Sequence, residues 1–175
     1  HPLKKLIYFS TSSIETGEKS KYINFKLNIE KYILSNSKNC LILRLPIVVG
    51  KTLNKSQLVP YLNYHLLNNL ALNIKRNCYR YLIDVEDLPK IVDFIVKSKT
   101  KLNIITVNYN NKISVVEIVD ILSKLNNLKT KKVNYCEYHS TEKFSKNNDF
   151  IKLIDKHDFN TKPVNILSKY YKNNN

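Results

Sequence analysis

The sequence predicts an α/β protein in which a parallel sheet carries helices on its faces. Short apolar runs of strand length alternate along the chain with segments in which apolar residues recur at helical spacing, and this alternation is typical of parallel sheets. The length of 175 residues is enough for one domain with a sizeable core. Hydrophobic residues make up 43% of the chain and charged residues 25%, which excludes wholesale disorder.

The first half of the chain shows the alternation in order. An apolar run at 6–9 leads into hydroxyl side chains at 10–13 and predicts a buried strand that stops at a polar turn. Residues 21–34 carry apolar side chains at helical spacing, so a helix is expected there. The apolar run at 40–45 predicts a second buried strand, and residues 58–72 again show near-helical spacing.

The second half continues the pattern. Strands are expected at 79–85 and 102–107, on either side of an amphipathic helix over 87–96. Ser114 opens a further helix and is followed three residues later by Glu117, which is the spacing of a capping box. The last expected elements are a strand at 132–138 and two short helices at 150–155 and 164–171.

The chain is strongly basic, with 29 Lys and Arg against 14 Asp and Glu and a formal net charge of +15. A charge of this size favours anionic partners. Only three of the basic residues are arginines, and no cluster of basic and aromatic residues typical of single-strand binding is visible. We therefore expect a solvated lysine-rich surface and keep a basic nucleic-acid-binding module as the weaker alternative.

Several residue counts exclude whole classes of function. No run approaches the roughly 18 apolar residues of a transmembrane helix, so no membrane span is expected. The two glycines, Gly17 and Gly50, do not suffice for a glycine-rich phosphate loop. The three cysteines are widely spaced and form no metal-ligand pattern, which predicts a reducing, cytoplasmic compartment and no metal. The sequence contains no methionine, so we expect the natural start to be missing.

One pair of side chains could carry proton-transfer chemistry. Tyr22 and Lys26 are four residues apart on the helix expected at 21–34, so they share one face. An ammonium beside a phenol favours the phenolate, and a hydroxyl from the preceding turn at 10–13 could hold a substrate oxygen in line with it. The alternative interpretation is a half-buried tyrosine beside a lysine whose stem packs on the helix.

The order of the motifs along the chain resembles that of the extended short-chain dehydrogenase/reductase family, the NAD-dependent epimerases and dehydratases of nucleotide sugars. The segments that carry the resemblance are 6–14 with its hydroxyl turn, 22–26 with the following Glu30, 43–50, 80–88 and 113–118.

The resemblance implies a partial Rossmann-like parallel sheet with flanking helices and a small C-terminal substrate-binding α/β region. On this interpretation the chain is a single fragment, with 1–50 and 79–107 forming the catalytic part and 51–78 and 108–175 the substrate-binding part. The glycine-rich N-terminal half of the family is absent from the sequence. Because that half holds the cofactor pyrophosphate, we expect the fragment alone to be inactive.

The resemblance also implies a role for each matching residue. Thr11 would hold the reacting substrate oxygen, with Ser12 as the fallback, and Tyr22 would be the general acid/base. Tyr22, Lys26 and Pro46 would contact the NAD or NADP cofactor, Lys26 through the nicotinamide ribose. The reaction implied is hydride transfer in a nucleotide-sugar epimerase, dehydratase or reductase.

Substrate contacts and assembly are implied in the same way. Ser12, Ser13 and Arg80 would bind the nucleotide sugar, and the arginine fork suits its diphosphate. The helix that carries Tyr22 and Lys26 commonly packs against its copy in a dimer of this family, so a homodimer is expected.

Three positions depart from the family pattern. Glu15 stands where a tyrosine is usual, Ile47 where an asparagine touches the substrate, and Asp84 where a histidine is often found. These changes leave the sugar and the type of reaction open. They also motivate an alternative, a non-catalytic relative that keeps the fold for binding or assembly.

Overall fold

The computed structural model describes residues 5–17, 19–109, 111–129, 132–137, 150–152, 159 and 161–172. By its internal contacts the chain divides into two compact units, each described by itself below. The first comprises His1–Pro46, Pro89–Asn108 and Thr141–His157, and the second comprises Ile47–Leu88, Tyr109–Ser140 and Asp158–Asn175. The sequence-based division into catalytic and substrate-binding parts concerns function, and it stays a prediction.

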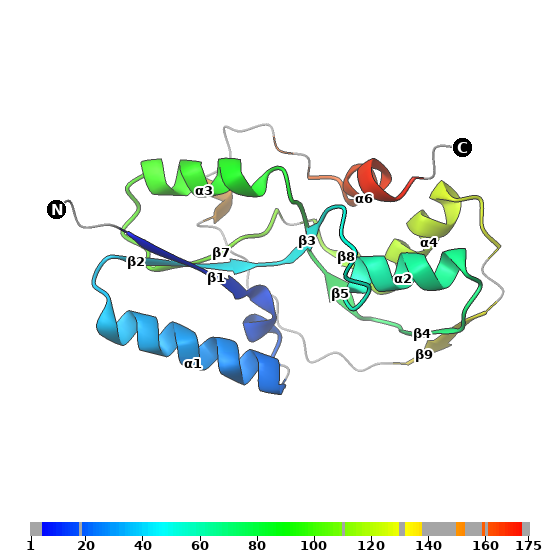
Figure 1. Ribbon diagram of the computed structural model, residues 1–175, viewed down its shortest axis with the longest axis horizontal. Coiled ribbons are helices and arrows are strands. Elements are labelled where there is room, and N and C mark those ends of the chain that lie inside the picture. Colours follow the sequence, from blue (N-terminus) through cyan, green and yellow to red (C-terminus); the bar gives the residue numbers. More distant parts are fainter. Residues whose placement is uncertain are drawn as a thin grey trace. The chain divides into compact units, whose positions relative to one another are not determined.

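The first unit is built on a parallel sheet in the order β1-β2-β7. Its strands are β1 (Leu6–Thr11), β2 (Cys40–Leu45) and β7 (Ile104–Thr106). Figure 1 shows the helices α1 (Lys21–Asn36) and α3 (Leu88–Lys97) on opposite faces of this sheet. The predicted α/β class with a parallel sheet and flanking helices is confirmed.

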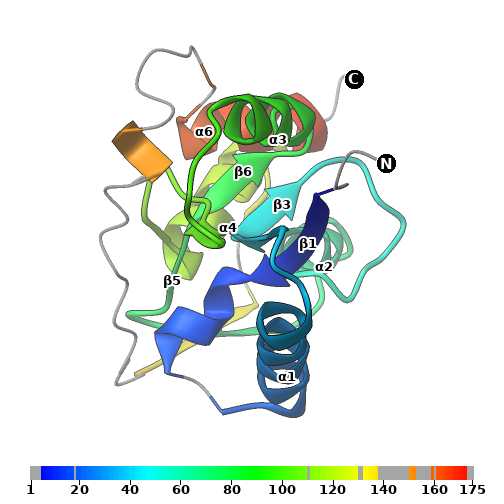
Figure 2. The same ribbon diagram turned by 90° about the vertical axis from the view of Figure 1, so that its left-hand side faces the viewer.

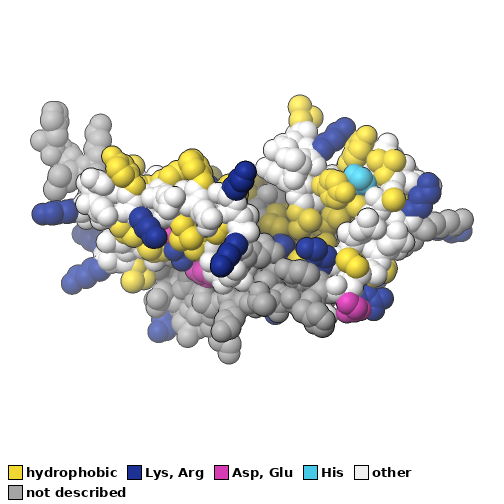
Figure 3. Space-filling view, turned by 90° about the horizontal axis from the view of Figure 1, so that it is seen from below, with side chains coloured by type: hydrophobic (Ala, Val, Ile, Leu, Met, Phe, Trp, Pro, Cys, Tyr) yellow, Lys and Arg dark blue, Asp and Glu magenta, His cyan; other side chains and the backbone are white. Residues whose placement is uncertain are grey.

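The middle strand of this sheet is buried because its sequence is apolar on both faces. Leu41, Ile42 and Leu43 of β2 are fully buried, as expected for a strand that is covered by helices on each side. Beneath α1 the core gathers around Ile33 and Ile42. The other side of α1 faces outward, and Figure 3 shows hydrophobic side chains mixed with lysines there.

Among its described residues, the second unit contains three pairs of short strands. The pairs β3 (Ile47–Val49) with β6 (Leu82–Asp84) and β4 (Leu72–Lys75) with β9 (Val133–Cys136) are parallel. The pair β5 (Tyr79–Arg80) with β8 (Ile113–Ser114) is antiparallel.

The described part of the second unit also contains three helices, which are α2 (Leu58–Leu67), α4 (Val115–Leu125) and α6 (Pro163–Tyr171). Their apolar faces share one core, in which Leu62, Ile118 and Ile166 are buried. The predicted capping box at the start of α4 is confirmed, because Ser114 and Glu117 bind each other's backbone N–H groups.

Two predicted elements differ from the structure. The helix expected at 58–72 ends at Leu67, because Asn69 adopts a left-handed conformation (φ 50°) and the chain then enters β4. The strand expected at 79–85 is interrupted at Tyr81, because β5 pairs antiparallel with β8 whereas β6 pairs parallel with β3. Of the helix expected at 150–155, only 150–152 lie within the described residues, and these are helical.

Candidate functional site

The hydroxyl-rich turn lies where β1 ends. β1 runs into a 3₁₀ helix, η1 (Ser12–Thr16), and the chain then returns into α1 (Figure 2). Thr11 caps η1, since its Oγ1 accepts a hydrogen bond from the N–H of Ser13 at 3.3 Å. Thr11, Ser12 and Ser13 are all partly exposed. They lie at the carboxyl end of a parallel strand, which is the edge where open α/β sheets bind ligands.

Lys26 connects α1 to β1, the strand that leads into this turn. Its Nζ donates a hydrogen bond to the carbonyl oxygen of Phe9, 3.1 Å away, and lies 4.8 Å from the ring centroid of Tyr8. The same ammonium is 5.9 Å from the ring centroid of Tyr22. The structure therefore brings Lys26 and Tyr22 together on one face of α1, beside β1.

Tyr22 presents its phenol to solvent at the start of α1. Ser20 caps this helix by accepting a hydrogen bond from the N–H of Ile23 at 3.1 Å, so Tyr22 lies in the first turn and Lys26 in the second. Tyr22 is 56% exposed. A phenol that is open to a ligand, next to a lysine fixed by the backbone, can give a proton to an oxygen or take one from it.

A buried ion-pair network supports the same elements. The Arg44 guanidinium on β2 donates to both carboxylate oxygens of Glu30 on α1, at 3.1 and 2.6 Å. It also donates to Glu15 of η1 at 3.4 Å, and Glu15 accepts a further hydrogen bond from the Thr106 hydroxyl on β7. These contacts, first of all the hydrogen bond to Glu30, raise the pKa of Arg44. The network therefore ties η1 and α1 to the sheet.

The remaining predicted site residues lie in different places. Pro46 directly follows β2 and is the last residue of the first unit's N-terminal segment. Arg80 belongs to the second unit, in β5, where its guanidinium donates to the carbonyl oxygen of Tyr79 at 2.6 Å. Thr11, Ser12, Ser13, Tyr22, Lys26 and Pro46 all belong to the first unit.

Sequence reasoning missed a second ion-pair cluster, at the end of β6. The Asp84 carboxylate is 3% exposed and binds the Nζ of Lys169 at 2.8 Å and the hydroxyl of Tyr170, both on α6. Burial acts to raise the pKa of Asp84, but the hydrogen bonds from Lys169, Tyr170 and the N–H of Glu86 outweigh it and lower the pKa. Burial and the Asp84 carboxylate together raise the pKa of Tyr170 to about 12.

Two further properties follow from the residues that the structure describes. Within those ranges, His, Cys, Asp and Glu side chains do not gather in threes that could bind a metal ion. Among the same residues, every helix is too short or too polar to cross a membrane.

The comparisons with known proteins establish the fold. A scan against protein-family models and a search of curated proteins by sequence found no match. Among solved structures, a dTDP-glucose 4,6-dehydratase from Bacillus anthracis in complex with NAD superposes with a TM-score of 0.73 at 16% identity, over 97% of this chain and 62% of that one.

Two epimerases are similar to the chain as well. A UDP-glucuronic acid 4-epimerase mutant from Bacillus cereus, bound to a fluorinated UDP-glucuronic acid and NAD, gives a TM-score of 0.75 at 20% identity, over 96% of this chain and 60% of that one. The ADP-L-glycero-D-manno-heptose-6-epimerase of Helicobacter pylori gives 0.68 at 20% identity, over 94% and 58%. The chain thus has the fold of part of such enzymes and spans about three fifths of their length.

Proposed function

We propose that this chain is part of an extended short-chain dehydrogenase/reductase that acts on a nucleotide sugar with NAD or NADP. The observation that carries the proposal is that Lys26 donates a hydrogen bond to the Phe9 carbonyl of β1 and lies beside the ring of Tyr22. The fold supports it, because the dehydratase and the 4-epimerase that share it were solved with NAD bound.

The residues present fit the nicotinamide side of the cofactor. An ammonium has three donors, and Lys26 uses one of them on Phe9, which leaves others for the hydroxyls of a ribose. Pro46 would line the same pocket. When bound, the cofactor would supply the site that accepts and returns a hydride. The sequence, with glycines only at 17 and 50, provides no glycine-rich loop for the pyrophosphate.

The chain's own residues would handle the proton and the orientation of the substrate. Tyr22 would take a proton from a sugar hydroxyl or return one to a ketone through its phenolic oxygen. Thr11 would hydrogen-bond that same substrate oxygen, with Ser12 and Ser13 beside it on η1. Arg80 would bind the diphosphate of the nucleotide sugar.

The test is turnover by the intact protein that contains this chain, with NAD and with UDP-glucose, UDP-glucuronic acid or dTDP-glucose. We expect Tyr22→Phe to lower kcat by at least about 100-fold, the scale of a lost proton carrier. Thr11→Val should cost less, because it removes a hydrogen bond and no titrating group. Tyr32→Phe is the matched control, since Tyr32 lies on the same helix and is 70% exposed. Equal activity of Tyr22→Phe and wild type would reject the catalytic role.

A second candidate function is a non-catalytic relative that binds a ligand or a partner. Glu15 favours it, because this departure from the family pattern is engaged by Arg44 and Thr106 instead of facing a substrate. Calorimetric titration of the intact protein with NAD separates the candidates. Saturable binding of NAD supports the enzyme, and its absence supports the non-catalytic relative.

A further inference from the structure

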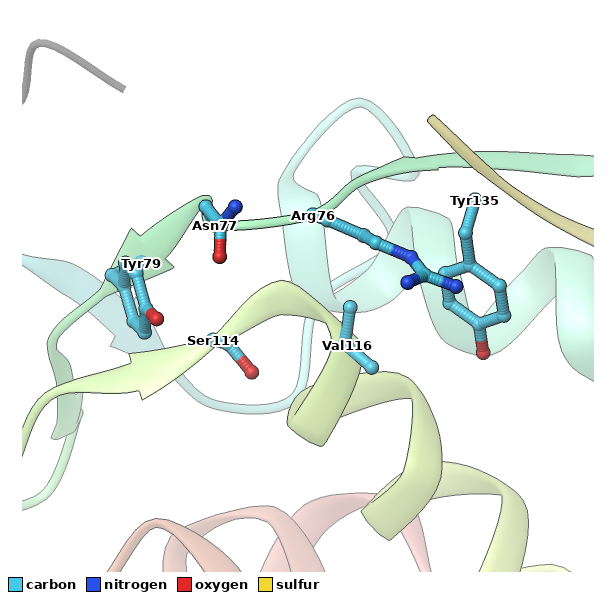
Figure 4. A pocket seen from close by; sticks show the side chains of 6 residues that line it. All are labelled: Arg76, Asn77, Tyr79, Ser114, Val116 and Tyr135. Carbon is cyan, nitrogen blue, oxygen red and sulfur yellow. The ribbon is translucent and has the colours of Figure 1, made fainter. Parts of the chain in front are cut away.

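We propose that a cavity in the second unit, at the junction of β5, β8, α4 and β9, binds a free mononucleotide, with its base against a tyrosine ring and its phosphate at Arg76. The cavity has a volume of about 440 Å³ and is lined by Arg76, Asn77, Tyr79, Ser114, Val116 and Tyr135 (Figure 4). Ligand pockets commonly have volumes of about 300–1,000 Å³, so a ligand of this size fits.

The arrangement of the lining suits a flat ligand. In Figure 4, Tyr79 and Tyr135 stand at the two ends of the cavity, with Arg76 and Asn77 along one side and Ser114 and Val116 along the other. Tyrosine rings are platforms on which nucleic-acid bases stack with little dependence on the base. Tyr135 is 40% exposed, so its ring is accessible to such a base.

A cation accompanies each of the two rings. The guanidinium carbon of Arg76 lies 5.4 Å from the ring centroid of Tyr135, and the Nζ of Lys112 lies 4.1 Å from that of Tyr79. These distances are in the range of cation–π contacts. A ligand that combines an aromatic ring with a negative group can contact both the tyrosine ring and the cation of a pair, and a nucleotide is such a ligand.

Arg76 can accept a phosphate at small cost. Its existing ion pair with Glu137 spans 3.8 Å between side chains that are 57% and 68% exposed, and such exposed pairs contribute little. The backbone is nevertheless fixed, because the N–H of Arg76 donates to the carbonyl oxygen of Cys136 at 2.9 Å. The Arg76 side chain therefore extends from a fixed backbone position, and its guanidinium can form a bidentate contact with phosphate.

Acidic side chains near the cavity disfavour a phosphate on the side of Ser114. Glu117 accepts hydrogen bonds from both the N–H and the hydroxyl of Ser114, so the start of α4 is already capped. Burial and the charge of Asp120 raise the pKa of Tyr135, and the charge of Arg76 acts in the opposite direction. The phosphate is thus directed to the side of the cavity that carries Arg76.

This cavity is distinct from the proposed contact of Arg80 with a substrate diphosphate. Successive side chains of a β-strand point to opposite faces. Tyr79 lines the cavity, so Arg80, the next residue of β5, points to the other face. The inference therefore does not rest on the proposed enzymatic function.

The test is calorimetric titration of the intact protein with uridine 5′-monophosphate at low salt. We expect saturable binding that Arg76→Ala weakens by about 10-fold or more, the scale of a hydrogen bond to a charged group. Tyr135→Ala should weaken binding by a similar factor, because the base can no longer stack on the ring, whereas Tyr135→Phe should retain most of the affinity.

Two controls separate this cavity from other sites. Lys55→Ala removes another cation that lies over a tyrosine ring, 3.9 Å from the centroid of Tyr64, and should leave the affinity unchanged. Arg80→Ala should also leave it unchanged, because Arg80 faces away from the cavity. Far-UV circular dichroism confirms that each variant is folded.

Three results would overturn the proposal. The first is full affinity in both Arg76→Ala and Tyr135→Ala. The second is binding of inorganic phosphate as tight as that of the nucleotide, because the base would then contribute nothing. The third is a short single-stranded oligonucleotide that binds far more tightly than the mononucleotide and loses affinity steeply with salt, which would assign the cavity to a nucleic-acid surface.

Discussion

Replacing Arg44 with methionine should destabilise the first unit more than any exposed substitution. Arg44 has 17% of its side chain exposed, and its partner Glu30 only 3%, so Arg44→Met would leave the Glu30 carboxylate buried without its cation. Removing one partner of a buried ion pair costs about 3–5 kcal/mol. We expect a loss near the lower end, about 3 kcal/mol, because the Glu15 and Arg44 side chains retain some contact with solvent.

Urea unfolding of the intact protein, followed by circular dichroism, measures this loss. Lys97→Met is the control, because the Lys97–Asp93 pair is 2.7 Å long but its side chains are 74% and 60% exposed. That pair should contribute no more than about 0.5 kcal/mol. The double variant Arg44→Met/Glu30→Met should regain most of the stability, since apolar side chains can replace a buried ion pair. Equal losses for Arg44→Met and Lys97→Met, or no recovery in the double variant, would refute the reasoning.

Three further predictions concern a titration, a helix cap and an assembly surface. In the folded protein the pKa of Asp84 lies below its ordinary value, so the Asp84 carboxylate contributes fully to stability above about pH 4. This contribution disappears as the pH falls through the lowered pKa. The midpoint of urea unfolding should therefore decrease less with falling pH in Asp84→Asn than in the wild type. Ser114→Ala removes the α4 cap and should cost about 1 kcal/mol in the same unfolding assay, and an unchanged midpoint would contradict this. Phe25 and Tyr32 are 61% and 70% exposed on α1, so Phe25→Lys should convert the proposed homodimer to a monomer in sedimentation, and a monomeric wild type would reject the dimer.

Elements that depend on local signals were predictable from the sequence. The apolar run 40–45 matches β2, and the Ser114–Glu117 spacing matches the observed capping box. Both could be predicted because burial on two faces and helix capping are each encoded by residues that are close together in the sequence. β4 was not predicted, because Leu70 and Leu72 continue the helical spacing of the preceding segment. Only the pairing of β4 with the distant β9 makes this segment a strand.

In the candidate site, too, only the local arrangement could be predicted from the sequence. The spacing of Tyr22 and Lys26 places them on one helical face, and the structure confirms that they lie together. The hydrogen bond from Lys26 to the Phe9 carbonyl could not be predicted, because it joins two elements across the fold. The ion pair of Arg44 could have been predicted from the sequence, because a charged residue at the end of a buried apolar run requires a partner. The spacing of Glu30, seven residues after the buried Ile23 on α1, indicates which acid faces the same way.

Two of the departures from the family pattern have a common physical explanation in the structure. Glu15 and Asp84 each place a carboxylate at the end of a strand or in the turn after it, and each carboxylate meets a cation from a distant segment, Arg44 or Lys169. Both contacts therefore hold parts of one unit together: η1 to the sheet, and α6 to the end of β6. Because both acids are paired with cations within the fold, these two departures stabilise the units in which they lie. The binding of Glu15 by Arg44 favours the non-catalytic relative, whereas the contact of Lys26 with Tyr22 favours the enzyme, so the titration with NAD decides between them.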